Sequence, residues 1–309
     1  MNTQNTLGID IGGTRLRAGL VSPGGAVLSR AVGVTPARST GQAVVDDVAK
    51  VVAEAIRGHD PASILAAGVC APGPLDAERG IAQATPTIDG FRDFPIRDRI
   101  AVAIGLPTYL DHDGHAAAYG EWRFGAGQGV ANMVFVTVST GIGGGAIVDG
   151  RLQRGRRGMA AHVGHMTIDP NGPRCNCGNK GCWEAFAAGP AFALAARDRG
   201  FADGAAVFAA ARAGDPAALD LTAAEARLLG IGIVNLVHIY SPDVVVLGGG
   251  MSAGLDLMRA GIETYIAEHA MSPFARVAIR AGAMGDTAGM VGAAALARDL
   301  ALGRAGDTP

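Results

Sequence analysis

The sequence has no excess of charge of either sign. Its 26 basic and 28 acidic side chains leave a net charge of −2 over 309 residues. Nucleic-acid binding without sequence preference needs a basic face, so we expect no nucleic-acid partner. Charged residues make up only 17% of the chain and hydrophobic ones 49%, a balance typical of a folded globular protein and not of a disordered one. The length suits one large core or two medium ones.

Targeting and membrane-spanning segments are also missing. The polar start, Met1 to Thr6, leads directly into an expected strand and does not have the pattern of a signal peptide. No apolar run reaches the roughly 20 residues that a bilayer-spanning helix needs. We therefore expect a cytoplasmic protein without a membrane partner, in a compartment where thiols stay reduced. The one basic cluster, from Arg151 to Arg157, is expected to be a solvated loop, with binding of an anionic substrate as the alternative.

Two familiar nucleotide-binding motifs are absent, namely a G-x-G-x-x-G sequence at a helix opening and a G-x-x-x-x-G-K-[ST] loop. Their absence excludes Rossmann and Walker-type sites. Glycine-rich turns of another kind are present at Asp10–Thr14 (DIGGT), Ser139–Gly145 (STGIGGG) and Leu247–Gly250 (LGGG). Glycine has no Cβ, so the backbone N–H groups of such turns can approach phosphate oxygens closely.

Together the three turns predict a nucleotide whose phosphates are held from both sides of a cleft. The Thr14 hydroxyl adds a donor, and Asp10 places a carboxylate where Mg²⁺ would bridge the phosphates. The first two turns each join two β-runs, Leu7 to Val21 and Phe135 to Val148, and each is followed by a hairpin turn. Two copies of one hairpin predict two related domains.

Strands elsewhere alternate with helical stretches, which predicts an α/β architecture. A strand is expected from Ile64 to Val69. Periodicity and stop signals predict a helix after His112, several short helices in the alanine-rich stretch from 184 to 226, and helices over Arg227–Ile239 and Ala288–Leu302.

Three of the four cysteines stand within eight positions, in the run C-N-C-G-N-K-G-C from Cys175 to Cys182. Ten residues earlier the sequence H-V-G-H ends at His165. Three thiolates and one imidazole at this spacing match a structural zinc site, although H-x-x-H could also present His162 as the ligand. The remaining cysteine, Cys70, stands in an apolar stretch and is expected to be a small core residue.

A phosphoryl acceptor needs a base, and the segment Tyr109 to Glu121 supplies two candidate carboxylates. Asp111 and Asp113 both stand at the junction between an expected strand and an expected helix. One of them is expected to cap the helix. The other is a candidate base, because a loose phosphoryl-transfer transition state asks it only to orient a hydroxyl and accept its proton late.

With these motifs in place, the chain resembles the bacterial ROK family (repressor, open reading frame, kinase) of the actin/hexokinase ATPase superfamily. The resemblance covers nearly the whole chain. It rests on the three glycine turns, the P-G-P-L-D segment ending at Asp76, the D-x-x-A-A-A-x-G-E helix from Asp113 to Glu121, and the C-x-C-G-x-x-G-C-x-E run from Cys175 to Glu184.

The resemblance implies a two-domain, actin-like (ribonuclease H-like) α/β fold with sugar and ATP in the cleft. We expect one domain over 1–112 plus 288–309 and a larger one over 113–287, with a zinc knuckle at 165–182. A homodimer is expected by resemblance only. Cofactors implied are ATP, Mg²⁺ and structural Zn²⁺, the zinc being held by His165, Cys175, Cys177 and Cys182.

Site residues follow from the same resemblance. The register of A-A-A-x-G-E assigns the catalytic base to Asp113. Sugar-binding residues implied are Gly73, Thr87, His112, Asp113, His162, His165 and Glu184. Residues implied to bind the nucleotide are Asp10, Gly12, Gly13, Thr14, Arg15, Thr140, Gly141, Gly143, Gly249 and Gly250.

Three positions depart from the family pattern where it contacts sugar. His112 replaces an Asn, Thr87 replaces the Asn of a T-P-N motif, and His162 replaces the Glu of an E-x-G-H motif. A neutral imidazole accepts one hydrogen bond and donates one, whereas a carboxylate only accepts, so the pocket's polarity differs. His162 resembles the residue of bacterial N-acetylmannosamine kinases more than that of glucokinases.

The sequence therefore predicts an ATP-dependent kinase for the 6-hydroxyl of a hexose or N-acetylhexosamine, with N-acetylmannosamine or glucose as the best candidates. One alternative is a ROK-type transcriptional regulator. It is disfavoured because the first glycine turn begins at Gly8 and leaves no room for a preceding helix-turn-helix. Another alternative is a sugar-sensing protein without kinase turnover.

Overall fold

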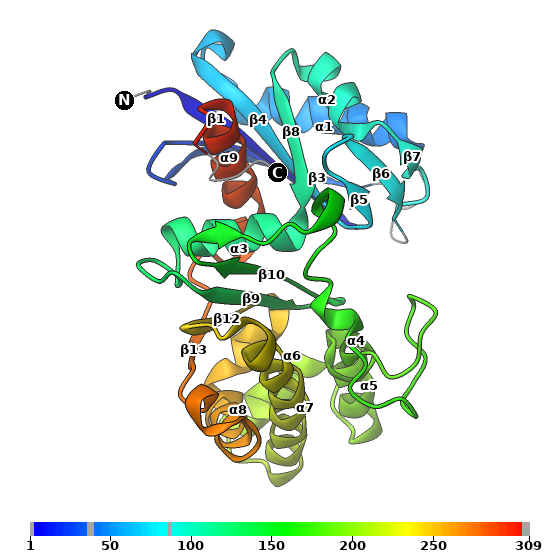
Figure 1. Cartoon of the computed structure of the whole chain (residues 1–309). Helices are drawn as coiled ribbons and strands as arrows, with labels where there is room; N and C mark the ends of the chain where they lie inside the picture. The colour runs from blue at the N-terminus through cyan, green and yellow to red at the C-terminus, as the bar shows by residue number, and fades with distance from the viewer. Residues whose placement is uncertain (1–2, 36–39, 86–87, 305–309) are drawn as a thin grey trace. The chain divides into compact units, whose positions relative to one another are not determined.

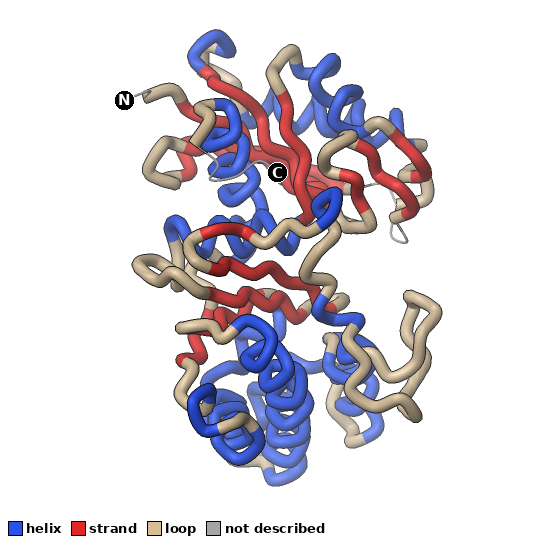
Figure 2. The backbone as a smooth tube through the Cα atoms, viewed as in Figure 1, coloured by secondary structure: helices blue, strands red, loops and turns tan. Residues whose placement is uncertain are grey.

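The computed structural model describes residues 3–35, 40–85 and 88–304, and its contacts divide the chain into two compact units. Unit 1 comprises residues 1–129, 151–161 and 286–309, and unit 2 comprises 130–150 and 162–285. Each unit has its own sheet and its own covering helices, which are seen in Figures 1 and 2. The α/β class predicted from the sequence is confirmed.

Unit 1 is built on a five-stranded sheet in the order β3-β2-β1-β4-β8. Strands β1 to β3 form an antiparallel meander, and β4 and β8 run parallel to β1. Helices α1 and α9 contact this sheet, and α3 packs against α9. The strands are β1 Asn5–Ile11, β2 Arg15–Val21, β3 Val27–Val34, β4 Ile64–Ala71 and β8 Thr108–His112; the helices are α1 Gly41–Ala55, α2 Ile96–Ile104, α3 Asp113–Phe124 and α9 Ala288–Ala301.

Short elements complete unit 1. A three-stranded sheet in the order β5-β6-β7 is formed by the part of the chain between β4 and β8. These elements are η1 Pro61–Ser63, β5 Leu75–Asp76, β6 Ile81–Ala84, β7 Arg92–Phe94, β11 Arg151–Leu152 and η2 Arg156–Gly158.

Two glycines allow α9 to approach the unit 1 sheet closely. A Cβ at Gly8 would stand 2.0 Å from the carbonyl oxygen of Met290, and one at Gly68 would stand 1.9 Å from that of Ala293. Both are closer than any real Cβ contact, so larger residues would push the helix away. Strand β1 is almost continuously buried, as expected for a strand covered on both faces.

Unit 2 repeats the same strand pattern. Its hairpin β9–β10 is antiparallel, β12 runs parallel to β9, and β13 runs parallel to β12. The sheet has five strands in the order β11-β10-β9-β12-β13, and its run β10-β9-β12-β13 has the same pairing senses as β2-β1-β4-β8 in unit 1. The two glycine-turn hairpins predicted from the sequence are β1–β2 and β9–β10, and they belong to two sheets with similar strand pairing.

Helices form the rest of unit 2, and α7 and α8 pack side by side (Figure 1). The elements are β9 Met133–Val138, β10 Ile142–Val148, η3 Val163–His165, α4 Trp183–Ala187, α5 Gly189–Asp198, α6 Gly204–Arg212, α7 Pro216–Tyr240, β12 Val244–Gly248, η4 Gly250–Gly254, α8 Leu255–His269, η5 Ser272–Phe274 and β13 Ala278–Ala281, with η6 Gly285–Thr287 at the unit boundary. The helix expected at Arg227–Ile239 is the second half of α7. Its first half begins at Pro216, inside the stretch expected to form only short helices.

The compact units differ from the predicted domains at α3. The sequence placed the first domain at 1–112, whereas the contacts place α3 in unit 1. The physical reason is close helix packing: a Cβ at Gly292 of α9 would stand 1.7 Å from the carbonyl oxygen of Ala116 in α3. The segment 151–161 also belongs to unit 1.

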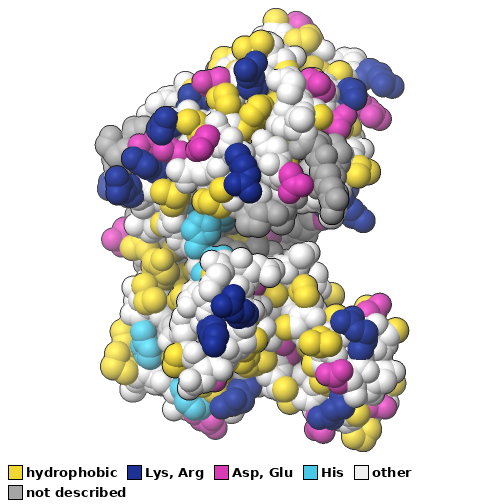
Figure 3. Space-filling model, turned by 90° about the vertical axis from the view of Figure 1, so that its right-hand side faces the viewer, with side chains coloured by type: hydrophobic (Ala, Val, Ile, Leu, Met, Phe, Trp, Pro, Cys, Tyr) yellow, Lys and Arg dark blue, Asp and Glu magenta, His cyan; other side chains and the backbone are white. Residues whose placement is uncertain are grey.

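The charge pattern of the surface agrees with the balanced composition. On the face shown in Figure 3, Lys and Arg side chains are interspersed with Asp and Glu. Within the described residues, no helix has both the length and the hydropathy to cross a bilayer.

Candidate functional site

A row of polar side chains crosses the unit 1 sheet. Strand register pairs Arg17 with Asp10, Asp10 with Cys70, and Cys70 with Asp111. Directly paired residues project to the same face of a sheet, so these four side chains share one face. Arg17 Nη1 donates to Asp10 Oδ2 at 3.1 Å, and the Cys70 thiol donates to Asp10 Oδ1 at 3.6 Å.

The Asp10 carboxyl has an unusual protonation equilibrium. Burial raises its pKa from 3.8 to about 6, and the nearby Asp113 carboxylate adds to the rise, while Arg17 opposes it. Cys70 is fully buried, as predicted, but it also bonds Asp10 and is therefore more than a core filler. A Cβ at Gly289, in the first turn of α9, would stand 3.4 Å from both the Asp10 carboxyl carbon and the Cys70 sulfur.

The turn after Asp10 is open to solvent. Gly12 and Gly13 are half-buried, and Thr14 and Arg15 are exposed. The Gly12 N–H bonds the Arg15 carbonyl at 2.8 Å, which closes the turn between β1 and β2. The geometry is that of an exposed glycine turn next to a carboxylate, suited to phosphate and Mg²⁺.

The junction of β8 and α3 separates the two candidate carboxylates. Asp111 has 7% of its side chain exposed, whereas Asp113 has 43% exposed. Asp113 is the first residue of α3, and its Oδ1 accepts the Gly114 N–H at 2.7 Å. Only Asp113 of this pair can be reached by a substrate.

The helix cap is neither of the expected aspartates. His112 is the N-cap of α3, and its Nδ1 accepts the Gly114 N–H at 3.3 Å. Burial lowers the pKa of His112, which favours the neutral ring that this cap requires. The expectation that Asp111 or Asp113 caps the helix is wrong.

Asp111 is instead the centre of a buried ionic network. Its Oδ1 accepts the His112 N–H at 2.8 Å and lies 2.9 Å from His115 Nδ1, while its Oδ2 accepts from Arg154 Nε at 2.9 Å. Hydrogen bonds and charge from His115 and Arg154 outweigh the effect of burial and hold the pKa of Asp111 well below its usual range. Arg154 is thus not in the purely solvated loop that the sequence suggested.

In unit 2, the glycine turns lie at the ends of neighbouring parallel strands. Thr140 and Gly141 follow β9, and Gly249 and Gly250 follow β12; all four are exposed or half-buried. A Cβ at Gly249, whose φ is +80°, would stand 2.4 Å from the carbonyl oxygen of Val138, so glycine allows the two turns to lie close together. Ligands of α/β proteins bind outside the carboxyl ends of such strands.

Glu184 joins the β9–β10 turn to the cysteine cluster. Its Oε2 accepts the Ile142 N–H at 2.9 Å, and its Oε1 lies 3.7 Å from the Cys175 sulfur. A Cβ at Gly141 would stand only 2.5 Å from Glu184 Oε2, which explains a glycine there.

The predicted metal ligands come together in one cluster. His165, Cys175, Cys177 and Cys182 each offer an atom within 4.8 Å of the others. Cys175 Sγ lies 3.6 Å from His165 Nδ1, and Cys177 Sγ lies 3.6 Å from Cys182 Sγ. Ligands about 2.0–2.3 Å from a tetrahedral zinc stand roughly 3.5–3.8 Å apart, so this donor set fits Zn²⁺. The His162 ring stacks on His165 at 6.3 Å and is outside this set.

Comparison with known proteins gives the family. The model of the family described as "ROK family" matches residues 6–300. The chain belongs to the ROK family. It is 36% identical to a glucokinase of Streptomyces coelicolor, covering 95% of this chain and 98% of that protein. It is 35% identical to an N-acetylmannosamine kinase of Escherichia coli, with the same coverage. Its structure is similar to that of a ROK family glucokinase from Streptomyces griseus in complex with glucose and AMPPNP, with TM-score 0.85 and 36% identity over 96% of this chain and 99% of that one.

The remaining predicted site residues of this ROK protein are placed as follows. Gly73 is half-buried just after β4, and Gly143 is half-buried in β10. Thr87 lies outside the described residues. His162 is half-buried and directly precedes η3, which carries His165.

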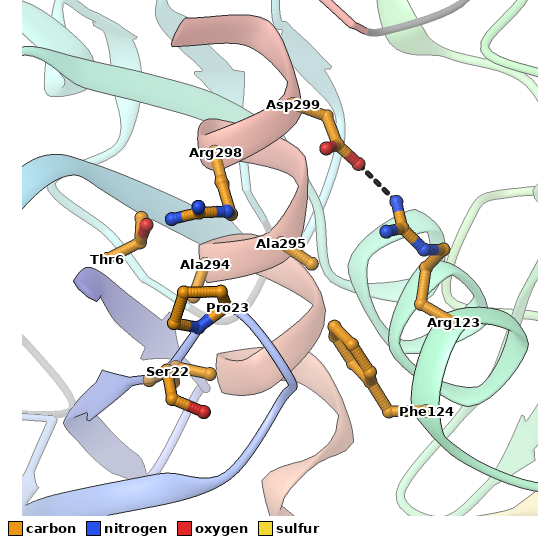
Figure 4. Close-up of a pocket in the computed structure, with 10 residues that line it drawn as sticks. Thr6, Ser22, Pro23, Arg123, Phe124, Ala294, Ala295, Arg298 and Asp299 are labelled. Carbon is orange, nitrogen blue, oxygen red and sulfur yellow. Dashed lines mark hydrogen bonds and ion pairs between the residues drawn. The ribbon is translucent and has the colours of Figure 1, made fainter. Parts of the chain in front are cut away.

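A separate hollow in unit 1 does not belong to this site. Figure 4 shows it between α9, the end of α3 and the turn after β2, beside the ion pair of Arg123 with Asp299. It has room for about one water molecule, far less than a sugar needs. None of the predicted site residues lines it.

Sequence reasoning missed the roles of His115 and Arg154. His115 follows Asp111 by four residues, and this spacing was a usable signal because it allows contact at a helix start. Arg154 is 43 residues from Asp111, and no local pattern links the two.

Proposed function

We propose that this ROK family protein is an ATP-dependent sugar kinase that phosphorylates the 6-hydroxyl of a hexose or N-acetylhexosamine. The observation that carries the proposal is the half-exposed Asp113 carboxylate at the start of α3, beside the Asp10 turn. Relatives at 35–36% identity over nearly the full length are a glucokinase and an N-acetylmannosamine kinase.

In the proposed mechanism Asp113 orients the 6-hydroxyl and accepts its proton as the phosphoryl group transfers. The glycine turns at 12–14, 140–143 and 249–250 hold phosphates through their backbone N–H groups. Asp10 would hold Mg²⁺, which neutralises charge on the phosphates when bound. Because the transition state is loose, positioning and charge stabilisation account for most of the catalysis.

Sugar recognition is assigned to Gly73, Thr87, His112, His162, His165 and Glu184. His112 is placed for this role because it directly precedes Asp113 and caps α3 through its Nδ1. A zinc ion on the four-ligand cluster would hold the His165 ring and the chain leading to Glu184 in place. Of the candidate sugars we favour N-acetylmannosamine, with glucose as the second candidate, because His162 replaces a carboxylate.

The test is a coupled ADP-release assay with a panel of hexoses, ketoses and amino sugars, using protein of measured zinc content. Sugar-dependent ADP release with one or two members of the panel supports the proposal. Sugar binding by calorimetry without ADP release would favour the sugar-sensing alternative. Cytoplasmic location and a homodimer are proposed on the family resemblance, and sedimentation tests the second.

A further inference from the structure

The side chain of His115 is completely buried and lies between two oxygens. Its Nδ1 is 2.9 Å from Asp111 Oδ1, and its Nε2 is 3.1 Å from the carbonyl oxygen of Ala160. A carbonyl oxygen only accepts hydrogen bonds, and so does an ionised carboxylate. Both ring nitrogens must therefore carry a proton, which makes the ring an imidazolium.

Charges around the ring are consistent with this state. Asp111 faces Nδ1 from β8, and its other oxygen is bound by Arg154. The His112 ring meets the His115 ring edge-on at 5.5 Å, and His112 is neutral because its Nδ1 accepts the Gly114 N–H. Asp113 stands next to His112 and adds a second negative charge nearby.

One end of the network fixes the segment that carries the base. Asp111 Oδ1 accepts the backbone N–H of His112, the residue before Asp113. With His115 and Arg154 bound, Asp111 cannot rotate away from this bond. The start of α3 is thereby held against the end of β8.

The other end fixes the segment that leads to His162. Ala160 donates its N–H to the Arg154 carbonyl at 2.9 Å, which closes the loop from 154 to 160. Ala161 has a φ of +61°, in the left-handed region that a residue with a Cβ rarely adopts. Such a backbone needs support from outside the loop, and the His115 bond to Ala160 supplies it, two residues before His162 in the chain.

We propose that His115 is a positioning residue, held as an imidazolium between Asp111 and Ala160, which fixes the start of α3, where Asp113 stands, and the loop 154–160 that leads to His162. The inference rests on the proposed sugar kinase function. We expect His115 to act on the sugar side of the reaction and not on the nucleotide side, because its two contacts are to Asp111, beside the start of α3, and to Ala160, and neither lies in the Asp10–Thr14 turn.

The kinetic test uses His115→Asn, whose amide nitrogen can replace Nδ1 but can neither reach Ala160 nor carry a charge. We expect the KM for the sugar to rise and its kcat/KM to fall about tenfold to hundredfold, the effect of one charge-assisted hydrogen bond. The KM for MgATP should stay within about twofold. If His115→Asn does not fold, Arg154→Gln removes a second support of Asp111, and the same split is expected.

The matched control is Tyr119→Phe. Tyr119 lies one turn further along α3, is buried, and donates to the Asp299 carboxylate. Its loss should lower the melting temperature while leaving the sugar KM within about twofold. An unchanged sugar KM in folded His115→Asn, or an equal rise in Tyr119→Phe, would overturn the positioning role.

The charge state is tested without any turnover. In ¹⁵N-histidine-labelled protein at pH 7, the ring signals that disappear in His115→Asn should show a proton on both nitrogens. A ring with one bare nitrogen would overturn the assignment. If no sugar is phosphorylated by the native protein, the proposed function fails, whereas these spectra still decide the state of His115.

Discussion

Glu225 gives the chain a pH-dependent stability that can be worked out from its surroundings. It lies in α7 with 2% of its surface exposed, and among the described residues its Oε1 has no hydrogen-bond partner. Burial raises its pKa from 4.5 to about 8. The folded protein therefore holds the proton at neutral pH, whereas the unfolded chain releases it.

The sign of the effect follows from this difference. Below pH 4.5 both states are protonated and the full stability is present. As the pH rises from 4.5 to about 8, unfolding releases a proton and the free energy of unfolding falls by about 1.4 kcal/mol per pH unit. Between pH 5 and pH 7 the loss from Glu225 alone is about 3 kcal/mol. Above pH 8 the contribution is constant.

Glu225→Gln keeps the size of the side chain and removes the ionisable group. Between pH 5 and pH 7 the free energy of unfolding of the wild type should therefore fall by about 3 kcal/mol more than that of the variant. Any constant offset from the amide cancels in this comparison. The relevant quantity is the slope difference.

Fluorescence of Trp183 can report on the unfolding of unit 2. Trp183 is fully buried, and its Nε1–H donates to the Leu228 carbonyl in α7, three residues after Glu225. The chain has two tryptophans, so a Trp122→Phe background leaves Trp183 as the only one. Urea titrations at pH 5, 6, 7 and 8 give the two curves. Parallel curves would refute the buried, protonated state of Glu225.

Four further predictions concern the proposed site. Asp113→Asn should lower kcat about 10²-fold or more with unchanged stability, measured by steady-state kinetics and thermal melting, because it removes only the base. Asp111→Asn should instead destabilise the fold by about 3 kcal/mol, since it leaves the buried His115 ring and the half-buried Arg154 guanidinium without their anion. Cys177→Ser should lower bound zinc and activity together, as measured by metal analysis alongside turnover. His162→Glu should shift kcat/KM toward glucose and away from N-acetylmannosamine with zinc content unchanged.

Each of these has a result that contradicts it. An Asp111→Asn protein that melts like the wild type would contradict the stabilising role of the ionic network. Full activity of Asp113→Asn would contradict the assignment of Asp113 as the base. Cys70→Ser is the control for the cysteine variants, because Cys70 lies outside the metal cluster and its replacement should leave zinc unchanged. For His162→Glu, an unchanged sugar preference would refute the specificity role, and loss of zinc would make His162 a ligand.

Features with a local signature could be predicted from the sequence. The DIGGT and STGIGGG turns each bring their hairpin with them, because glycine permits the turn and alternating apolar residues specify the strands. The metal-ligand cluster could be predicted from the spacing of its three cysteines and His165 alone, and the structure brings these four residues together. The helix predicted after His112 also placed Asp113 correctly, at the first residue of α3.

Features that depend on tertiary packing could not be predicted. The assignment of α3 to unit 1 depends on the close approach of Gly292 to Ala116, residues far apart in the chain. Asp111 looked like a cap because helix-start aspartates usually cap, but tertiary contacts with Arg154 make it a buried anion. Glu225 stands in the stretch expected to form several short helices, and only the packing of α7 shows that it is buried.

The most direct test of the account is the fate of the γ-phosphate of ATP. With N-acetylmannosamine or glucose present, ³¹P NMR should show ADP and a sugar phosphate ester whose signal is split by the two protons at C6. The ester should be absent over the same time with Asp113→Asn protein of equal zinc content. Formation of inorganic phosphate alone, or no sugar-dependent loss of ATP with any hexose, would contradict a sugar 6-kinase.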